Sequence, residues 1–244
     1  MKALILAGGY GTRLAAVAQN TPKPLLTIGS KTLIDYAVEK LKGYGQFSEV
    51  VVVTNNKFYE NFVQWAKLHP ELKIRVINDG TNTNEERLGS VGDLNYVWSK
   101  EKSPDDWLII GGDNLFDQSL DAFMSFCASH KPAVTIGLYD IKDIKAATKF
   151  GVVGLDKSGK VITFQEKPEH PASSSIGMCL YYFPKETLGY IEEYRKESNT
   201  LDAAGSYIKW LSEKKNVYGF NFSGKWYDIG SIESLNEARA YFKV

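Results

Sequence analysis

Two short stretches near the N-terminus decide the fold: residues 6–14 read Leu-Ala-Gly-Gly-Tyr-Gly-Thr-Arg-Leu, and residues 22–26 read Pro-Lys-Pro-Leu-Leu. An apolar run over residues 3–6 precedes the glycines and predicts a buried strand. Glycines let consecutive backbone N–H groups turn toward one point, which creates a concave site for an anion. Arg13 and Lys23 add positive charge beside these amides. The two stretches therefore predict a polyphosphate site at the carboxyl end of the first strand.

Length and composition limit the class of protein. The 244 residues fit one large domain or two small ones, and 43% hydrophobic residues support a sizeable core. The 29 Lys and Arg residues balance 29 Asp and Glu residues, which argues against a nucleic-acid binder that works through bulk charge. Cys127 and Cys179 lack CxxC spacing, so we expect no disulfide framework and no zinc site. We see no signal peptide and no membrane-spanning run, and therefore expect a cytoplasmic protein.

Alternating apolar runs and helical periodicity predict an α/β fold. Strand-like runs over residues 49–54, 73–78 and 107–110 are separated by segments with helical spacing. This alternation predicts a Rossmann-like three-layer fold with a central, mostly parallel mixed sheet. From about residue 139 the pattern becomes β-rich, and residues 151–164 read as a hairpin. We interpret the chain, residues 1–244, as a single domain that contains a smaller β-rich cover over residues 139–183.

Two other phosphate-binding loops fit the first stretch less well. The dinucleotide fingerprint G-x-G-x-x-G needs a glycine where Leu14 stands, and an acidic residue after the second strand, where Asn55 and Asn56 stand. A P-loop would have to use the pair Lys31-Thr32 further along the chain. The P-loop motif needs a glycine directly before that pair, where Ser30 stands. A glycine turn without a ligand is the remaining alternative.

Five motifs in a fixed order resemble the sugar-1-phosphate nucleotidyltransferases, also called nucleoside-diphosphate-sugar pyrophosphorylases. The N-terminal pair is followed by Gly-Gly-Asp-Asn at 111–114, Phe-Gly-Val-Val at 150–153, Phe-Gln-Glu-Lys-Pro at 164–168 and Trp-Tyr-Asp-Ile-Gly-Ser at 226–231. The resemblance covers nearly the whole chain. It implies an enzyme that transfers a nucleotidyl group from a nucleoside triphosphate to a sugar 1-phosphate and releases pyrophosphate. The short glucose-1-phosphate thymidylyltransferase-like members fit best, because we see no C-terminal acetyltransferase or oligomerisation module.

The resemblance implies a nucleotide site on the glycine loop. Both substrates of such a reaction are anionic, so charge neutralisation and in-line alignment are the main needs. By resemblance, Arg13 would contact the departing pyrophosphate and Lys23 would lie near the α-phosphate. The expected nucleotide-binding residues are Leu6, Ala7, Gly8, Gly9, Gly11, Thr12, Arg13 and Gly89.

The resemblance also implies a metal site and a sugar site. Asp113 and Asp228 would hold Mg²⁺, which favours oxygen ligands and takes only one or two protein carboxylates. Glu166 would contact sugar hydroxyls and Lys167 the sugar phosphate, within the β-rich cover. The expected catalytic residues are Arg13, Lys23, Asp113 and Lys167. The expected sugar-phosphate-binding residues are Asn114, Gly151, Glu166, Lys167 and Gly177.

The nucleobase and the sugar are less well determined. Residues 86–93 replace the P-L-G-T-A-G-A segment of many members, and only Gly89 and Gly92 match its glycines. We expect dTTP or UTP with glucose 1-phosphate or a related hexose 1-phosphate. The alternatives are a cytidylyltransferase for a non-sugar phosphate, and a non-catalytic nucleotide-binding regulatory protein of the same fold. We expect no role for Tyr10 in the loop, and the aromatic content leaves room for a homodimer interface.

Overall fold

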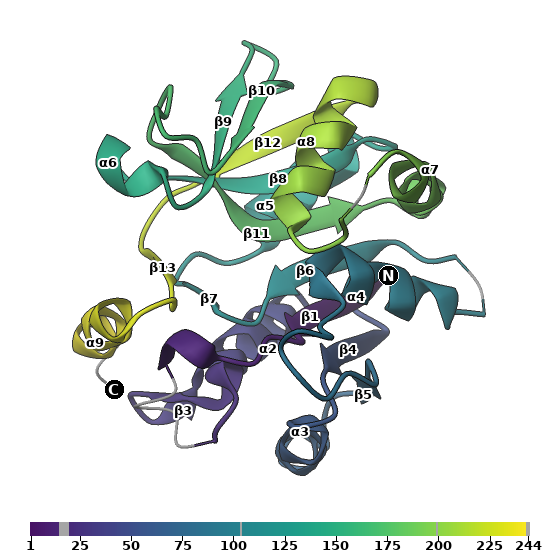
Figure 1. The fold of residues 1–244 in the computed structure, drawn as a ribbon, viewed down its shortest axis with the longest axis vertical. Helices are drawn as coiled ribbons and strands as arrows, with labels where there is room; N and C mark the ends of the chain where they lie inside the picture. The colour runs from purple at the N-terminus through teal and green to yellow at the C-terminus, as the bar shows by residue number, and fades with distance from the viewer. Residues whose placement is uncertain (15–19, 103, 199, 243–244) are drawn as a thin grey trace. The chain divides into compact units, whose positions relative to one another are not determined.

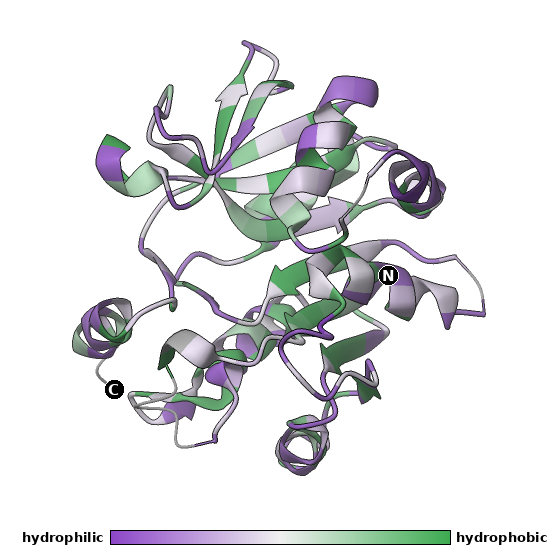
Figure 2. Ribbon diagram, in the orientation of Figure 1, coloured by the Kyte–Doolittle hydropathy of each residue, from purple (hydrophilic) through white to green (hydrophobic). Residues whose placement is uncertain are grey.

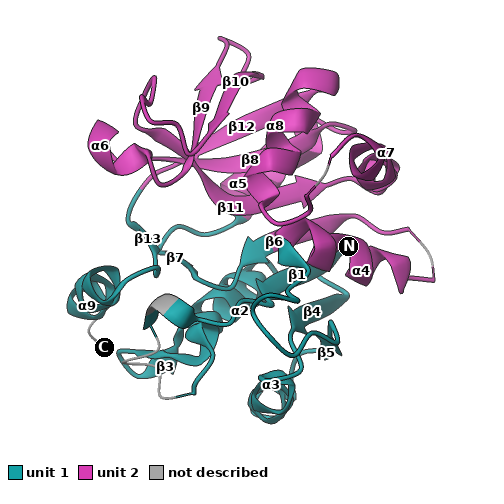
Figure 3. Ribbon diagram, in the orientation of Figure 1, with its two compact units in different colours: residues 1–89, 110–120, 224–244 teal, residues 90–109, 121–223 magenta. Residues whose placement is uncertain are grey.

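The computed structural model describes residues 1–14, 20–102, 104–198 and 200–242. It confirms the predicted α/β class, with helices and a mixed β-sheet (Figure 1). The chain divides into two compact units (Figure 3). The first unit comprises residues 1–89, 110–120 and 224–244, and the second comprises residues 90–109 and 121–223. The predicted insertion over residues 139–183 falls within the second unit.

The first unit is built on strands in the order β6-β1-β4-β5, of which β1, β4 and β5 run parallel. β1 (Lys2–Ala7) pairs with β4 (Glu49–Thr54), and β4 pairs with β5 (Ile74–Asn78). β6 (Trp107–Gly111) begins in the second unit and ends in the first. The other elements are η1 (Thr12–Leu14), η2 (Lys23–Leu25), β2 (Thr27–Ile28), β3 (Lys31–Thr32), α2 (Leu33–Tyr44), α3 (Tyr59–Ala66), β7 (Asn114–Phe116), β13 (Trp226–Asp228) and α9 (Ile232–Tyr241).

β4 is a fully buried strand, as its four consecutive valines predict. All six of its residues are buried, and Val50 to Val53 expose 3% of their surface or less. A parallel strand with both faces covered reads as a continuous apolar run, and each buried valine stabilises the fold by roughly 1.5–3 kcal/mol. Figure 2 shows β4 in green for this reason. α3 packs on β4 and β5.

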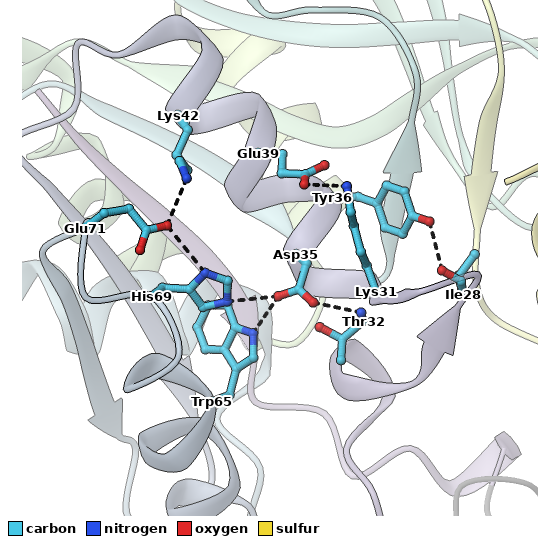
Figure 4. Close-up of polar contacts among 10 residues, drawn as sticks. All are labelled: Ile28, Lys31, Thr32, Asp35, Tyr36, Glu39, Lys42, Trp65, His69 and Glu71. Atoms are coloured by element: carbon cyan, nitrogen blue, oxygen red, sulfur yellow. Dashed lines mark hydrogen bonds and ion pairs between the residues drawn. The ribbon is translucent and has the colours of Figure 1, made fainter. Parts of the chain in front are cut away.

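The N-terminus of α2 is fixed by one carboxylate (Figure 4). Asp35 Oδ2 accepts the backbone N–H of Thr32 at 2.8 Å, which satisfies an otherwise unpaired donor before the helix. Asp35 Oδ1 also accepts the indole N–H of Trp65 at 2.8 Å and lies 3.1 Å from His69 Nε2. The helix ends at Gly45, in the left-handed conformation with φ 71°. Its buried face consists of Leu33, Ile34, Ala37, Val38 and Leu41.

Two short strands of the first unit were not predicted from the sequence. β7 and β13 pair antiparallel, which places Asp228 opposite Asn114 in the register. Leu115 and Ile229 are fully buried in a cluster with Leu14, Leu26, Ile28, Leu33, Leu235 and Ala238. The burial of these side chains anchors the segments that carry the acidic motifs.

The second unit contains a sheet in which most neighbouring strands are antiparallel. The predicted hairpin is confirmed, because β9 (Gly151–Leu155) pairs antiparallel with β10 (Val161–Glu166). β11 (Ser175–Phe183) pairs antiparallel with β9 and with β8 (Val134–Asp140), and β8 pairs in parallel with β12 (Val217–Phe222). The helices are α4 (Gly89–Ser99, whose first residue belongs to the first unit), α5 (Asp121–Ser129), α6 (Ile144–Ala147), η3 (Lys185–Thr187), α7 (Tyr190–Glu197) and α8 (Ala204–Lys214). Among the helices that the structure describes, we find none with the length and apolarity needed to cross a membrane.

Candidate active site

The glycine loop follows β1 and leaves space beside its backbone. Gly11 has φ 64°, a conformation that favours glycine. Gly9 does not lie in this region, and a Cβ built on it would meet no atom of the described residues within 4 Å. Packing against the described part of the chain therefore gives no reason for glycine at position 9. Close approach of a ligand to the backbone would give one.

The buried side chain of Asn55, directly after β4, binds the backbone of this loop. Asn55 Nδ2 donates to the carbonyl of Gly8 at 3.0 Å, and the Asn55 side chain is fully buried. Thr54 Oγ1 donates to the carbonyl of Ala7 at 3.1 Å. With these carbonyls bound from the β4 side, the loop conformation is set before any ligand binds. Sequence reasoning used Asn55 only to exclude a dinucleotide site and missed this contact, which joins residues 47 positions apart.

Tyr10 links the glycine loop to the polar segment after β5. Its hydroxyl lies 3.0 Å from Thr81 Oγ1, and its ring centroid lies 6.5 Å from that of Phe58. Thr81 is in turn held by Asp79, whose Oδ1 accepts the Thr81 backbone N–H at 2.7 Å. We expected no role for Tyr10 from the sequence. The structure gives it a contact that joins the predicted nucleotide loop to the polar segment between β5 and Gly89.

Lys23 and Asp113 meet at the carboxyl end of β1. Lys23 Nζ lies 2.8 Å from Asp113 Oδ2, and both side chains are only partly exposed. Gly112 makes this approach feasible, because its N–H donates to the Leu6 carbonyl at 2.9 Å. A Cβ on Gly112 would lie 2.6 Å from that same oxygen and 2.9 Å from Pro24 Cγ. Three of the sequence motifs therefore converge on one point in the first unit.

Asp228 completes this cluster. Its strand lies beside β7, and the N–H of Ile229 donates to the Asp113 carbonyl at 3.1 Å. Burial tends to raise the pKa of Asp113. The charge and hydrogen bond of Lys23, with hydrogen bonds from the backbone and from the Asp228 carboxyl, together outweigh burial and lower the pKa of Asp113. The cluster thus holds Asp113 as an ionised carboxylate, with a second carboxyl beside it.

The chemistry of this cluster suits a hard divalent cation. Mg²⁺ takes oxygen ligands, usually one or two carboxylates, and completes its shell with water and substrate phosphates. Asp113 and Asp228 supply that donor set, next to a loop with open backbone. Across the described ranges, no group of three or more His, Cys, Asp or Glu side chains could hold a metal. The two carboxylates fit a cation that completes its shell with water and phosphate oxygens.

Four predicted sugar-side residues come together in the second unit. Glu166, at the end of β10, is opposite Gly151 in the register of β9. A Cβ on Gly177 would lie 3.9 Å from the Gly151 carbonyl. Lys167 has φ 45°, and its N–H donates to the Phe150 carbonyl at 3.0 Å. This unusual backbone turns the chain directly after Glu166, and leaves the Lys167 side chain largely exposed.

Gly151 and Asn114 also make contacts within the protein. A Cβ on Gly151 would lie 2.5 Å from Phe164 Cζ, so ring packing already requires a glycine there. Asn114 lies in the first unit, is 97% buried, and accepts the indole N–H of Trp226. The predicted role of Asn114 at a sugar therefore competes with a role in holding β13 against β7.

The remaining predicted nucleotide-site residues are placed as follows. Leu6 and Ala7 end β1, Thr12 is exposed in η1, and the side chain of Arg13 lies outside the described part of the structure. Gly89 has φ 77° at the start of α4. The next two amides donate within the second unit, from Ser90 to the Asp202 carbonyl and from Val91 to the Leu201 carbonyl.

Comparison with known proteins identifies the family. The family model described as "Nucleotidyl transferase" matches residues 2–243. "Bifunctional protein GlmU" of Methanocaldococcus jannaschii is 31% identical over 99% of this chain, which spans 54% of that relative, about half its length. A crystal structure from Bacillus anthracis, named "Putative Glucose-1-Phosphate Thymidylyltransferase" and solved with sucrose, superposes with a TM-score of 0.83 at 24% identity. The superposition covers 99% of this chain and 94% of the Bacillus anthracis chain, so the two share the same fold. The chain therefore belongs to the nucleotidyl transferase family, as its five motifs predict.

Proposed function

We propose that this protein transfers a nucleotidyl group from dTTP or UTP to glucose 1-phosphate or a related hexose 1-phosphate, with Mg²⁺. The products are a nucleoside diphosphate sugar and pyrophosphate. One observation carries the proposal: Lys23, Asp113 and Asp228 converge at the carboxyl end of β1, beside the glycine loop. Ligands bind at this edge in open α/β sheets.

The roles of the first unit follow from its charges. The amides of the glycine loop would bind triphosphate oxygens, and Lys23 would neutralise charge that builds up at the α-phosphate. Asp113 keeps the Lys23 ammonium in place before substrates bind, at 2.8 Å. Asp113 and Asp228 would hold Mg²⁺, which when bound neutralises phosphate oxygens. A phosphate oxygen of the sugar 1-phosphate then attacks the α-phosphorus, and the bond to the pyrophosphate oxygen breaks.

The roles of the second unit concern the sugar phosphate. Lys167 presents an exposed ammonium, which suits a mobile phosphate partner. Glu166 presents a carboxylate, which accepts hydrogen bonds from sugar hydroxyls. Nearby, a Cβ on Gly177 would come no closer than 3.9 Å to the described residues, so the backbone there is open. The name of the Bacillus anthracis fold neighbour agrees with a glucose 1-phosphate substrate.

A substrate matrix tests this function. dTTP, UTP, CTP and GTP are each combined with a panel of sugar 1-phosphates, and pyrophosphate release is measured with Mg²⁺ and with EDTA. We expect release with dTTP or UTP and a hexose 1-phosphate, and its loss in EDTA. The panel also includes phosphocholine and a polyol phosphate. Turnover of CTP with one of these, or no release from any pair, would overturn the proposal.

A further inference from the structure

The carboxylate of Glu166 packs against a glycine in the first turn of α8. A Cβ built on Gly205 would overlap Glu166 Oε2 and lie 2.6 Å from Cδ and 3.1 Å from Oε1. Gly151 flanks the same carboxylate from β9, where a Cβ would lie 3.3 Å from Oε2. The Glu166 side chain therefore occupies the volume that any other residue at position 205 would fill.

Backbone conformation does not explain this glycine. Gly205 lies within α8 and has no positive φ, so every L-residue could adopt its conformation. Glycine in a helix is less favourable than alanine by roughly 0.5–1 kcal/mol. The neighbours Ala203 and Ala204 show that the segment accepts small side chains with a Cβ. The requirement at position 205 is thus one of space for Glu166.

The seated carboxylate has unused hydrogen-bonding capacity. Within the described ranges its one charged partner is Lys167, whose Nζ lies 3.9 Å from Oε1, and no protein group there donates a hydrogen bond to it. Burial raises the pKa of Glu166, and Lys167 only partly offsets that effect. A half-buried carboxylate without donors is costly unless a ligand supplies them. Hydroxyl groups of a hexose are donors of that kind.

We propose that Gly205 is a positioning residue for the hexose 1-phosphate, because its missing side chain seats the Glu166 carboxylate where sugar hydroxyls reach it. This inference rests on the proposed function and extends the sugar site to α8, which none of the five motifs includes. A side chain at position 205 would displace the carboxylate. Sugar binding would then weaken, while nucleotide binding, which the proposed function assigns to the first unit, would not change.

Two glycine variants of the second unit test the proposal. Gly205→Ala is compared with Gly189→Ala, which lies just before α7 and whose Cβ would meet nothing within 4 Å. We expect Gly205→Ala to raise the KM for the sugar 1-phosphate at least tenfold and to change the KM for the nucleotide less than twofold. Gly189→Ala should change neither KM. An unchanged sugar KM in a folded Gly205→Ala protein would overturn the proposal.

A double-mutant cycle distinguishes an effect of Gly205 on the position of the Glu166 carboxylate from a general disturbance of α8. If Gly205 acts through Glu166, then Gly205→Ala should change the sugar KM less than twofold in a Glu166→Ala background. Additive effects of the two substitutions would contradict the inference.

A third measurement does not depend on turnover. In protein with ¹³C-labelled glutamate, the Glu166 Cδ signal should move in Gly205→Ala and stay in place in Gly189→Ala. If the wild-type protein releases no pyrophosphate from any substrate pair, the proposed function fails. The NMR comparison still decides whether Gly205 seats Glu166, and an unmoved signal in Gly205→Ala would overturn that seating.

Discussion

The two units hold their charged residues in different ways. In the first unit, Lys23 is 17% exposed and its ammonium lies 2.8 Å from Asp113. In the second, Lys167 is 62% exposed and its ammonium lies 3.9 Å from Glu166. A sheltered ammonium held close to its carboxylate is arranged before substrate arrives, which favours electrostatic stabilisation of a transition state. An exposed ammonium 3.9 Å from its carboxylate can reorient around a ligand, which favours binding. The difference agrees with the proposed function, which assigns the chemical step to the first unit and sugar-phosphate binding to the second.

Removing either carboxylate of the first unit should have the largest effect. We expect Asp113→Asn and Asp228→Asn each to lower kcat at least ~100-fold, because loss of one charge-stabilising group costs about 10²–10³ in rate. Pyrophosphate release against Mg²⁺ concentration measures this. Asp156→Asn, in the exposed hairpin turn of the second unit, is the control and should keep full activity. Retention of most turnover in either variant would refute the metal assignment.

Substitutions of Gly112 and Gly205 should have the next largest effects, and the two should differ in their effect on stability. At Gly112 a Cβ would strike the backbone oxygen of Leu6, which cannot move without β1. Gly112→Ala should therefore lower both kcat and the free energy of unfolding, the latter by about 1–3 kcal/mol. At Gly205 the atoms struck belong to a side chain, so the unfolding free energy should fall much less. Gly43→Ala, in α2 with open space around it, is the stability control in urea melts. Equal losses of stability at positions 112 and 205 would contradict this difference.

Removal of the exposed lysine should have a moderate effect. We expect Lys167→Ala to raise the KM for the sugar 1-phosphate roughly tenfold, the equivalent of about 1.4 kcal/mol, with a small change in kcat. Lys157→Ala, in the turn of the same hairpin, controls for loss of surface charge. Initial rates at saturating nucleotide give both constants. A large fall in kcat with an unchanged KM would place Lys167 in the chemical step instead.

The smallest expected effect concerns the cap of α2 (Figure 4). Burial tends to raise the pKa of Asp35, but its hydrogen bonds with Thr32 and Trp65 and the charge of His69 together outweigh burial and lower the pKa below its ordinary value. The stabilisation from ionised Asp35 is therefore complete above that ordinary pKa and is lost as pH falls through the folded-state value.

Asp35→Asn should lower the free energy of unfolding by about 1 kcal/mol at pH 7, and the difference from wild type should shrink below about pH 4. Urea titrations across this range measure it. Glu39→Gln, on the exposed side of α2, should show a smaller difference at pH 7. A difference for Asp35→Asn that stays constant down to pH 2 would contradict the assignment.

Much of the fold was predictable because its signals are local. The valine run predicted β4 with the observed bounds, Glu49–Thr54, and the apolar run over residues 107–110 predicted β6, observed as Trp107–Gly111. The glycine loop with Lys23, and Asp113 after its buried strand, were each expected at the carboxyl edge of the sheet, where ligands bind in such folds. The direct contact of Lys23 with Asp113, at 2.8 Å, was not predicted.

What the sequence did not reveal depends on distant partners. β7 and β13 have three residues each, too few to show a period of two. The contact of Asn114 with Trp226 joins positions 112 residues apart, and no local sequence pattern around Asn114 predicts it. Gly205 follows two alanines in an ordinary helical segment, so its relation to Glu166 became visible only when β10 and α8 were seen together.

The pairing of β13 with β7 also sets an order of events during synthesis. Asp228 lies 115 residues after Asp113, so the two carboxyl groups cannot meet until the ribosome has made the third segment of the first unit. At about 5–20 residues per second, this delay is roughly 6–23 s. The glycine loop and Lys23 are complete well before then. A nascent chain therefore passes through a stage in which the glycine loop, Lys23 and Asp113 have been synthesised and Asp228 has not.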